Sequence, residues 1–279
     1  MSEETRIKEL RKPISTGELD RRFKAVRKAM EKEKLDCLIM QNNNQFLGGM
    51  TRYFTGVPAT NGYTMTVIFP LNTGITIISH GGPPLPAGPP DWAIHGVKER
   101  INLPFIPPLT RTNDMDAKAA VETLKKLDVK SLGVVAPATM CAFMYNYIRE
   151  NLPDLTMKYA TDLVDEIKAV KSDEEIEVIK ETAKMQDIVW GAAVAMVRPG
   201  VREYEIRSEI QRLCRNWGSE EQLIMVGSQP AGTPAPQKPD FYQNRTLQEG
   251  DQVCIMPEVN GPGGYYCEMS RTVQYTRWP

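Results

Sequence analysis

Two glutamates near the end of the chain have the spacing of a catalytic carboxylate pair. Residues 251–259 and 264–275 are predicted to be strands joined by Asn-Gly-Pro-Gly, a composition typical of a hairpin turn. Side chains alternate between the faces of a strand, so Glu258 and Glu268 converge if their faces coincide. Paired carboxylates in a partly dry pocket can have their pKa values driven apart, which gives one acid and one base. We therefore take Glu258 and Glu268 as candidate catalytic residues.

Two neighbours of this pair are candidate substrate-binding residues. Arg271 can anchor a substrate carboxylate through two parallel hydrogen bonds, which lysine cannot do. Tyr266 shares a strand face with Glu268, so it is a second candidate. Two alternatives stay open: one glutamate is simply exposed, or Arg271 forms an ion pair with one of them.

Histidine is scarce in this chain. Its two histidines, His80 and His95, both lie in the N-terminal half. A mechanism that needs a histidine base or a histidine metal ligand must use one of these or take one from another chain. The alternative is that both are ordinary exposed loop residues.

Composition excludes several classes of partner. The chain has 34 basic and 35 acidic residues, so no charge excess indicates a nucleic acid or membrane-surface partner. No apolar run approaches the roughly 20 residues that span a bilayer. The N-terminus lacks the apolar stretch of a signal peptide. The five cysteines are scattered, and together these features favour a reduced, cytoplasmic setting.

Hydrophobic periodicity predicts two domains with different architectures, 1–160 and 161–279. The first is expected to be an α/β domain with helices at 17–34, 115–127 and 138–151, strands at 35–40, 62–69, 74–79, 132–136 and 155–160, and a proline-rich loop at 81–114. The second is expected to contain helices at 173–197 and 202–217, an irregular stretch at 227–240, and the hairpin that carries the glutamates.

Four stretches, in this order, resemble the creatinase/aminopeptidase P/prolidase family. They are Tyr53-Phe54-Thr55-Gly56; Glu166 to Ser172 with Glu174-Glu175-Ile176; Arg198-Pro199-Gly200-Val201 with Glu203-Tyr204-Glu205-Ile206; and Gly250-Asp251 with Gly264-Tyr265 and Glu268-x-x-Arg271-Thr272. The resemblance implies an α/β N-terminal domain followed by an α+β pita-bread domain. It also implies that the pita-bread domain is incomplete here, because the family's last segment, with three of its metal ligands, is absent.

The resemblance further implies a departure from the family's two-metal site. The family's hairpin supplies two aspartates, and Met256 and Glu268 stand at their positions. A thioether is a poor ligand for hard or borderline cations. We therefore expect no metal and no cofactor, as in the creatinase-like, metal-independent branch. Creatinase's base histidine is not matched either, because residues 237–241 contain none.

The resemblance also implies an assembly. Family members build each active site across two subunits, which places Arg52 and Tyr53 near a partner's substrate. A homodimer, or a complementary subunit that supplies the missing segment, is expected. Either would cover an unpaired strand edge near Val273 and a partly uncovered apolar helix face near Ile206, Leu213 and Trp217.

These observations favour a hydrolase. The expected reaction is cleavage of a C–N bond in a small amide, amidine or dipeptide-like substrate, without bound metal. The alternative is a non-catalytic pseudo-peptidase that binds peptides or a partner protein. A third possibility is a fragment with no activity of its own.

Overall fold

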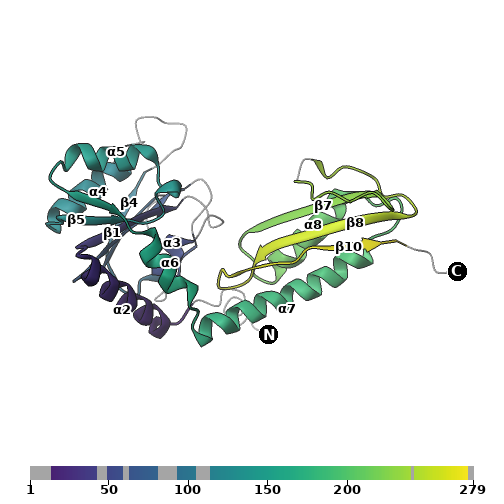
Figure 1. Cartoon of the computed structure of the whole chain (residues 1–279), viewed down its shortest axis with the longest axis horizontal. Helices are drawn as coiled ribbons and strands as arrows, with labels where there is room; N and C mark the ends of the chain where they lie inside the picture. The colour runs from purple at the N-terminus through teal and green to yellow at the C-terminus, as the bar shows by residue number, and fades with distance from the viewer. Residues whose placement is uncertain are drawn as a thin grey trace. The chain divides into compact units, whose positions relative to one another are not determined.

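The computed structural model describes residues 14–42, 49–58, 63–80, 93–104, 114–239 and 242–275 (Figure 1). The chain forms two compact units, one of residues Ile14–Ser172 and one that contains everything from Asp173 onward. The first unit extends past the expected border at residue 160, because helix α6 (Thr161–Ala169) packs against helix α2 (Thr16–Glu33). Within the described ranges, no helix combines the length and the hydropathy that crossing a membrane requires.

The N-terminal unit is built around a six-stranded mixed sheet with the order β4-β3-β2-β1-β5-β6. Its strands are β1 (Cys37–Asn42), β2 (Met65–Pro70), β3 (Ile75–His80), β4 (Val97–Leu103), β5 (Ser131–Val134) and β6 (Thr156–Tyr159). Its remaining helices are α3 (Met50–Thr55), α4 (Met115–Lys126), η3 (Pro137–Thr139) and α5 (Ala142–Asn151). The expected α/β architecture is confirmed, and every residue of the central strand β1 is buried.

One strand of this unit lies where a loop was expected. Residues 81–114 were predicted to be mostly loop, but β4 runs parallel to β3 from Val97 to Leu103. Its sequence Val-Lys-Glu-Arg-Ile-Asn-Leu alternates between half-buried and exposed positions, which is the period of an edge strand. The prolines and glycines on both sides of β4 hid this alternation. Residues 81–92 and 105–113 lie outside the described residues.

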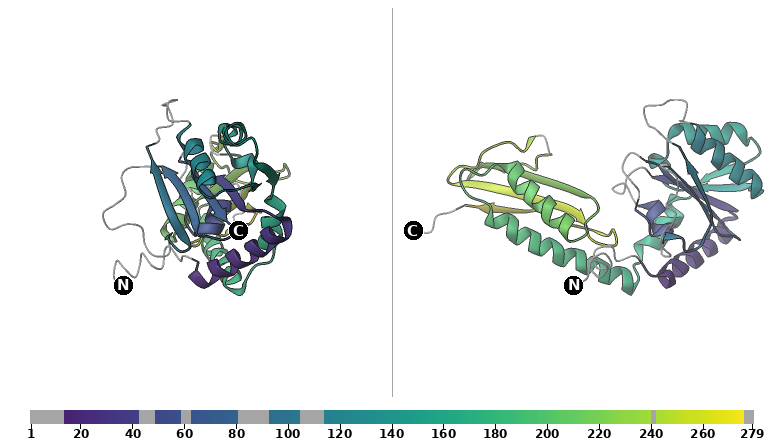
Figure 2. Two further views of the ribbon diagram at one scale, coloured as in Figure 1. Left: turned by 90° about the vertical axis from the view of Figure 1, so that its left-hand side faces the viewer. Right: turned by 180° about the vertical axis from the view of Figure 1, so that it is seen from behind.

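The C-terminal unit is a small antiparallel sheet with both of its helices on one face. Helix α7 (Asp173–Ala195) and helix α8 (Glu203–Asn216) accompany strands β7 (Gln222–Pro230), β8 (Asp251–Asn260), β9 (Tyr266–Glu268) and β10 (Arg271–Gln274) (Figures 1 and 2). The core lies between helices and sheet, where Ile206 and Ile210 of α8 pack with Ile255 of β8. The helix face near Ile206, Leu213 and Trp217 was expected to be partly uncovered. This is wrong for Ile206, which is fully buried, whereas Leu213 is half-buried and Trp217 is 46% exposed.

Strand β7 is a second difference from the sequence analysis, which had described residues 227–240 as irregular. Gln222–Pro230 pairs antiparallel with β8 along its whole length, from Gln222 opposite Val259 to Pro230 opposite Asp251. Residues 231–239 follow without regular structure, as expected. The strand extends across Gly227 because β8 offers a continuous partner. A β-carbon at Gly227 would lie 1.8 Å from the carbonyl oxygen of Pro236.

The hairpin that carries the glutamates is confirmed, with one interruption. Strand β8 pairs with β9 from Glu258 to Asn260 and with β10 from Gln252 to Ile255. Between these two ladders lies Pro257, whose carbonyl accepts from the backbone N–H of Met269 at 3.3 Å. Proline has no N–H with which to return that bond. The return strand is therefore split into β9 and β10.

Candidate functional site

The structure places Glu258 and Glu268 directly opposite each other. They are register partners on β8 and β9. Val259 and Ile255 on β8 point into the core under the helices, so alternation puts Glu258 on the opposite, helix-free face of the sheet. Side chains that face each other across strands have β-carbons about 5 Å apart, within reach of a shared proton or a shared substrate atom. The expected convergence of the two side chains is thus a feature of the fold.

The two carboxyl groups have different surroundings. Glu258 is half-buried and Glu268 is exposed. Burial, and after it the negative charge of Glu268, raises the pKa of Glu258 above its ordinary value. Glu258 therefore holds its proton to a higher pH than a free glutamate does, as a general acid must.

Tyr266 belongs to the same cluster. Its hydroxyl donates to Oε2 of Glu221 at 2.8 Å. Burial, then this hydrogen bond, then the charges of Glu221, Glu258 and Glu220 raise the pKa of the phenol. Tyr266 is thus a protonated hydrogen-bond donor at neutral pH, close enough to Glu258 to sense its charge. Its donor is already engaged by Glu221.

Arg271 does not join this cluster. It lies opposite Ile255, a core residue, so alternation places it on the helix side of the sheet, away from Glu258. Its side chain is exposed, and its Nη1 donates to the carbonyl of Ser270 at 3.1 Å. The alternative in which Arg271 forms an ion pair with one of the glutamates is not what the structure shows.

The same strand face carries sulfur beyond the carboxylates. Met256 is 4% exposed and lies opposite Met225 of β7, while Cys254 is in contact with the hydroxyl of Ser270 at 3.6 Å. Among the described residues, no three His, Cys, Asp or Glu side chains are grouped so as to hold a metal ion. Two carboxylates flanked by a buried thioether do not fit the five-ligand, two-metal set that the resemblance implies.

Residues 231–239 lie over this face and are fastened by a buried carboxylate. Glu203, the first residue of α8, is fully buried and accepts from Ser228 Oγ at 2.7 Å and from Lys238 Nζ at 2.7 Å. Gln237 Nε2 donates to Ser270 Oγ at 2.9 Å. The segment is therefore tied both to the start of α8 and to the residue beside Cys254.

Arg52 and Tyr53 lie in the N-terminal unit, on α3. Tyr53 is buried, and Arg22 both covers its ring, with 4.4 Å from guanidinium to ring centre, and donates to its carbonyl at 3.1 Å. Arg52 is half-buried on the same short helix. Within the unit Tyr53 is a packed residue. The role of both residues at a partner's substrate stays a prediction.

Both histidines have partners inside the N-terminal unit. His80 Nε2 lies 2.6 Å from Asp116 Oδ1, and the other oxygen of Asp116 accepts from Thr64. His95 lies 2.7 Å from Asp20 and stacks on Phe23. The alternative in which both are exposed loop residues is wrong for His80, whose side chain is fully buried.

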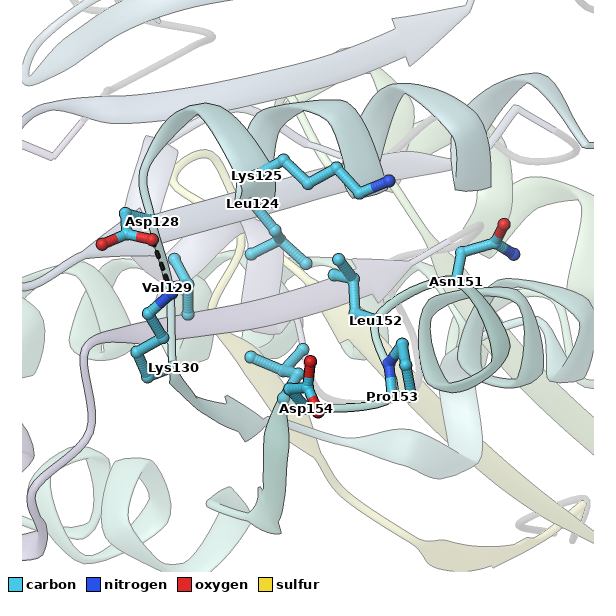
Figure 3. A pocket seen from close by; sticks show the side chains of 10 residues that line it. Leu124, Lys125, Asp128, Val129, Lys130, Asn151, Leu152, Pro153 and Asp154 are labelled. Atoms are coloured by element: carbon cyan, nitrogen blue, oxygen red, sulfur yellow. Dashed lines mark hydrogen bonds and ion pairs between the residues drawn. The ribbon is translucent and has the colours of Figure 1, made fainter.

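A pocket of about 300 Å³ opens at the C-terminal ends of α4 and α5 (Figure 3). Leu124 and Leu152 line it with apolar surface, and Lys130 on its rim pairs with Asp128 at 2.6 Å. It contains none of the predicted site residues. We assign it no chemistry.

Comparison with known proteins gives a family match for part of the chain and a fold match for most of it. Residues 177–278 match the model of metallopeptidase family M24. A solved Xaa-Pro dipeptidase from Bacillus anthracis superposes with a TM-score of 0.65 at 20% identity, over 91% of this chain and 64% of that one. The fold is the pita-bread fold. The α/β domain followed by a pita-bread domain that the sequence predicted is therefore confirmed.

Proteins with similar sequences match the chain over shorter stretches. Creatinase from Bacillus sp. (strain B-0618) is 31% identical over 40% of this chain and 30% of its own length. The probable dipeptidase PepE of Mycobacterium tuberculosis (strain ATCC 25618 / H37Rv) is 29% identical, also over 40% of this chain and 30% of its own. The match thus spans less than a third of either curated relative.

Two residues that shape the site were not identified from the sequence. Glu221 lies just before β7, a strand that was not predicted, so nothing connected it to Tyr266. Gln186 lies on α7 within the buried stripe of Thr182, Met185 and Val189. A polar residue inside a buried helical stripe needs a hydrogen-bond partner, and that was the available signal.

Proposed function

We propose that this chain contributes to a hydrolase of the creatinase/Xaa-Pro peptidase type, which cleaves a C–N bond in a small amide, amidine or dipeptide-like substrate without a metal. The observation that carries the proposal is the opposed pair Glu258 and Glu268 on the helix-free sheet face. The resemblance of residues 177–278 to a peptidase family supports the reaction class. The named relatives, a creatinase and dipeptidases, act on substrates of this size.

The proposed roles follow from the two environments. The exposed carboxylate of Glu268 accepts a proton from a water molecule as that water adds to the carbon of the C–N bond. Glu258, which holds its proton to a higher pH, donates it to the leaving nitrogen as the bond breaks. Transfer of a proton from Glu268 to Glu258 then returns the pair to its starting state. Tyr266 lies beside the pair as a substrate contact through its ring and its phenol oxygen, since its hydroxyl proton is donated to Glu221.

Metal independence is part of the proposal because of the donor set. Met256 and Glu268 stand at the positions of the family's two hairpin aspartates, and a buried thioether is a poor ligand for the cations involved.

A partner is also proposed: a second copy of the chain or a complementary subunit. Strands β7 and β10 each have a single strand neighbour within the described residues, β8. Unpaired strand edges favour pairing with another chain. In such an assembly Arg52 and Tyr53 would serve the site of the neighbouring copy. The free cysteines fit a reduced, cytoplasmic setting.

The experiment is a hydrolysis assay on the purified chain, alone and with its assembly partner if one is found. The substrates are Xaa-Pro dipeptides, guanidino acids and simple amides, each with a chelator and with added Mn²⁺. We expect turnover that survives the chelator and falls at least about 100-fold in Glu258→Gln and Glu268→Gln. Glu209→Gln, an exposed change on α8, is the matched control.

Two results would overturn parts of the proposal. Turnover that appears only with Mn²⁺ would contradict metal independence while leaving the reaction class intact. Calorimetric binding of dipeptides without turnover in any condition would favour the non-catalytic, peptide-binding alternative.

A further inference from the structure

Gln186 makes two hydrogen bonds to the backbone beside the carboxylate pair, from the opposite face of the sheet. It is 4% exposed, in the middle of α7, and its Nε2 donates to the carbonyl of Pro257 at 2.6 Å and to that of Cys267 at 3.1 Å. One side-chain amide therefore bridges strands β8 and β9. The contacts come from the helix side of the sheet, so Gln186 cannot touch a substrate on the other face.

Each of these carbonyls belongs to the residue just before one of the glutamates. Pro257 precedes Glu258, and Cys267 precedes Glu268. The peptide unit is planar, so fixing a carbonyl oxygen also fixes the N–H and α-carbon of the next residue. Holding both carbonyls to one amide thus sets the separation and tilt of the two α-carbons that carry the carboxylates.

The backbone pairing of the sheet is weaker at this point. Pro257 accepts from Met269 N–H but has no N–H to return, so one ladder bond is lost beside the carboxylate pair. Paired strands normally fix their separation by bonds in both directions. Gln186 does not replace that bond, because its amide donates to the carbonyls of Pro257 and Cys267 and not to that of Met269. It adds a side-chain tie between the same two strands, where the backbone pairing is weakened.

No charged group of α7 acts on Glu258 directly. The groups that face Glu258 are Glu268 and Tyr266 from β9, with Glu221 next to β7 bonded to Tyr266. On α7, Asp187 acts on Cys267 instead. An effect of Gln186 on the pair must therefore pass through the backbone.

We propose that Gln186 is a positioning residue for the carboxylate pair: its amide clamps β8 to β9 across the gap at Pro257 and sets the distance between Glu258 and Glu268. The expected effect of Gln186 on catalysis rests on the proposed function. The clamp itself is a structural claim and can be tested without turnover.

The same helix offers a matched control. Thr182, one turn earlier, is also buried, and its Oγ1 donates to the carbonyl of Tyr265 at 3.1 Å. That contact fastens the hairpin turn rather than the residues before the glutamates. Thr182→Val removes a similar helix-to-hairpin bond and leaves the clamp in place.

The test compares Gln186→Met and Thr182→Val by carbon NMR of labelled glutamate side chains through a pH titration. In Gln186→Met we expect the Glu258 titration midpoint to move toward that of a free glutamate, because the pair separates. In Thr182→Val we expect it to stay at the wild-type value. Gln186→Asn, too short to reach both carbonyls, is the second variant if Gln186→Met does not fold.

Activity gives a second measurement. If the wild type turns over a substrate, kcat should fall about 10- to 100-fold in Gln186→Met, with KM nearly unchanged. The alkaline limb of the pH profile, which reports loss of the Glu258 proton, should shift to lower pH. If the wild type shows no turnover, the proposed function fails and the NMR titration still decides the clamp. A Glu258 titration that is unchanged in Gln186→Met and Gln186→Asn, or equally shifted in Thr182→Val, would overturn the inference.

Discussion

Tyr266 and Glu221 form a hydrogen bond of 2.8 Å that places a third carboxylate next to the Glu258–Glu268 pair. Removing the Tyr266 hydroxyl leaves the half-buried carboxylate of Glu221 without this hydrogen-bond donor. We expect Tyr266→Phe to lower the free energy of unfolding by about 1.5 kcal/mol, the lower end for a bond to a charged group, because the site is partly solvated. Urea unfolding measures this. Tyr242→Phe, an exposed tyrosine on the same unit, should change little.

The raised pKa of Glu258 predicts how stability depends on pH. A carboxyl group whose pKa is raised by folding stabilises the protein fully below its unfolded pKa, and that contribution is lost as pH rises through the folded value. Glu258→Gln should therefore raise the melting temperature slightly at pH 7 to 8 and have little effect near pH 4. Thermal melts across this range test the prediction.

The control for this experiment is a glutamate whose pKa is shifted in the opposite direction. Lys180 lowers the pKa of Glu177 through a 2.7 Å hydrogen bond on the exposed face of α7. Glu177→Gln should thus lose, not gain, a small amount of stability as pH rises above 4. Equal pH dependence in the two variants would contradict the assignment for Glu258.

The candidate site was chosen from the sequence by strand alternation alone. Strand periodicity gave the hairpin and correctly brought Glu258 to the face of Glu268. Alternation also places Arg271, three residues after Glu268, on the opposite face, because the register of the return strand is continuous across its split. Arg271 was proposed for the chemistry of its guanidinium and not for its strand face. Alternation could not show Glu221, whose relevance depends on β7, an edge strand selected by its partner β8.

The fold was predicted wherever periodic segments were long. Helix α2 and helix α8 came within a residue or two of their observed ends. Strand β4 was missed because only seven residues alternate between two proline-rich runs. Tertiary pairing, in that case with β3, decides such short segments, and a single sequence does not contain that information.

Glu203 anchors the segment that lies over the candidate site. Its buried carboxylate holds Ser228 and Lys238 together. We expect Glu203→Gln to cost about 3 kcal/mol, because Lys238 loses its buried counter-charge. Glu209→Gln, on the exposed side of the same helix, should cost at most about 0.5 kcal/mol.

The same variant should loosen residues 231–239. Cys254, 7% exposed beside Ser270, should then react faster with a thiol reagent in Glu203→Gln than in Glu209→Gln. An unchanged reaction rate would show that the segment is held by other contacts.

Two glycines predict opposite outcomes for the same substitution. At Gly191, on α7, a β-carbon would meet nothing within 4 Å, so Gly191→Ala should stabilise by about 0.5–1 kcal/mol through helix propensity. At Gly227 a β-carbon would meet the Pro236 backbone, so Gly227→Ala should destabilise by about 2 kcal/mol or more. Chemical denaturation of both variants provides the measurement.

The proposed assembly is tested by sedimentation equilibrium of the 31.4 kDa chain at micromolar concentration. We expect a mass above that of one chain, since the outer edges of β7 and β10 have no strand neighbour in the described residues and Trp217 is 46% exposed. A stable single-chain mass, unchanged on mixing with the product of the neighbouring gene, would refute the assembly.

The N-terminal sheet ends on both sides in strands that resist further growth. At one side, β6 is only four residues long and carries Lys158 in its middle; at the other, β4 places Lys98 and Arg100 at its exposed positions. Short, charged edge strands are poor templates for adding another strand. This unit is therefore protected against sheet-to-sheet aggregation, and misassembly of the whole chain should begin from the C-terminal sheet instead.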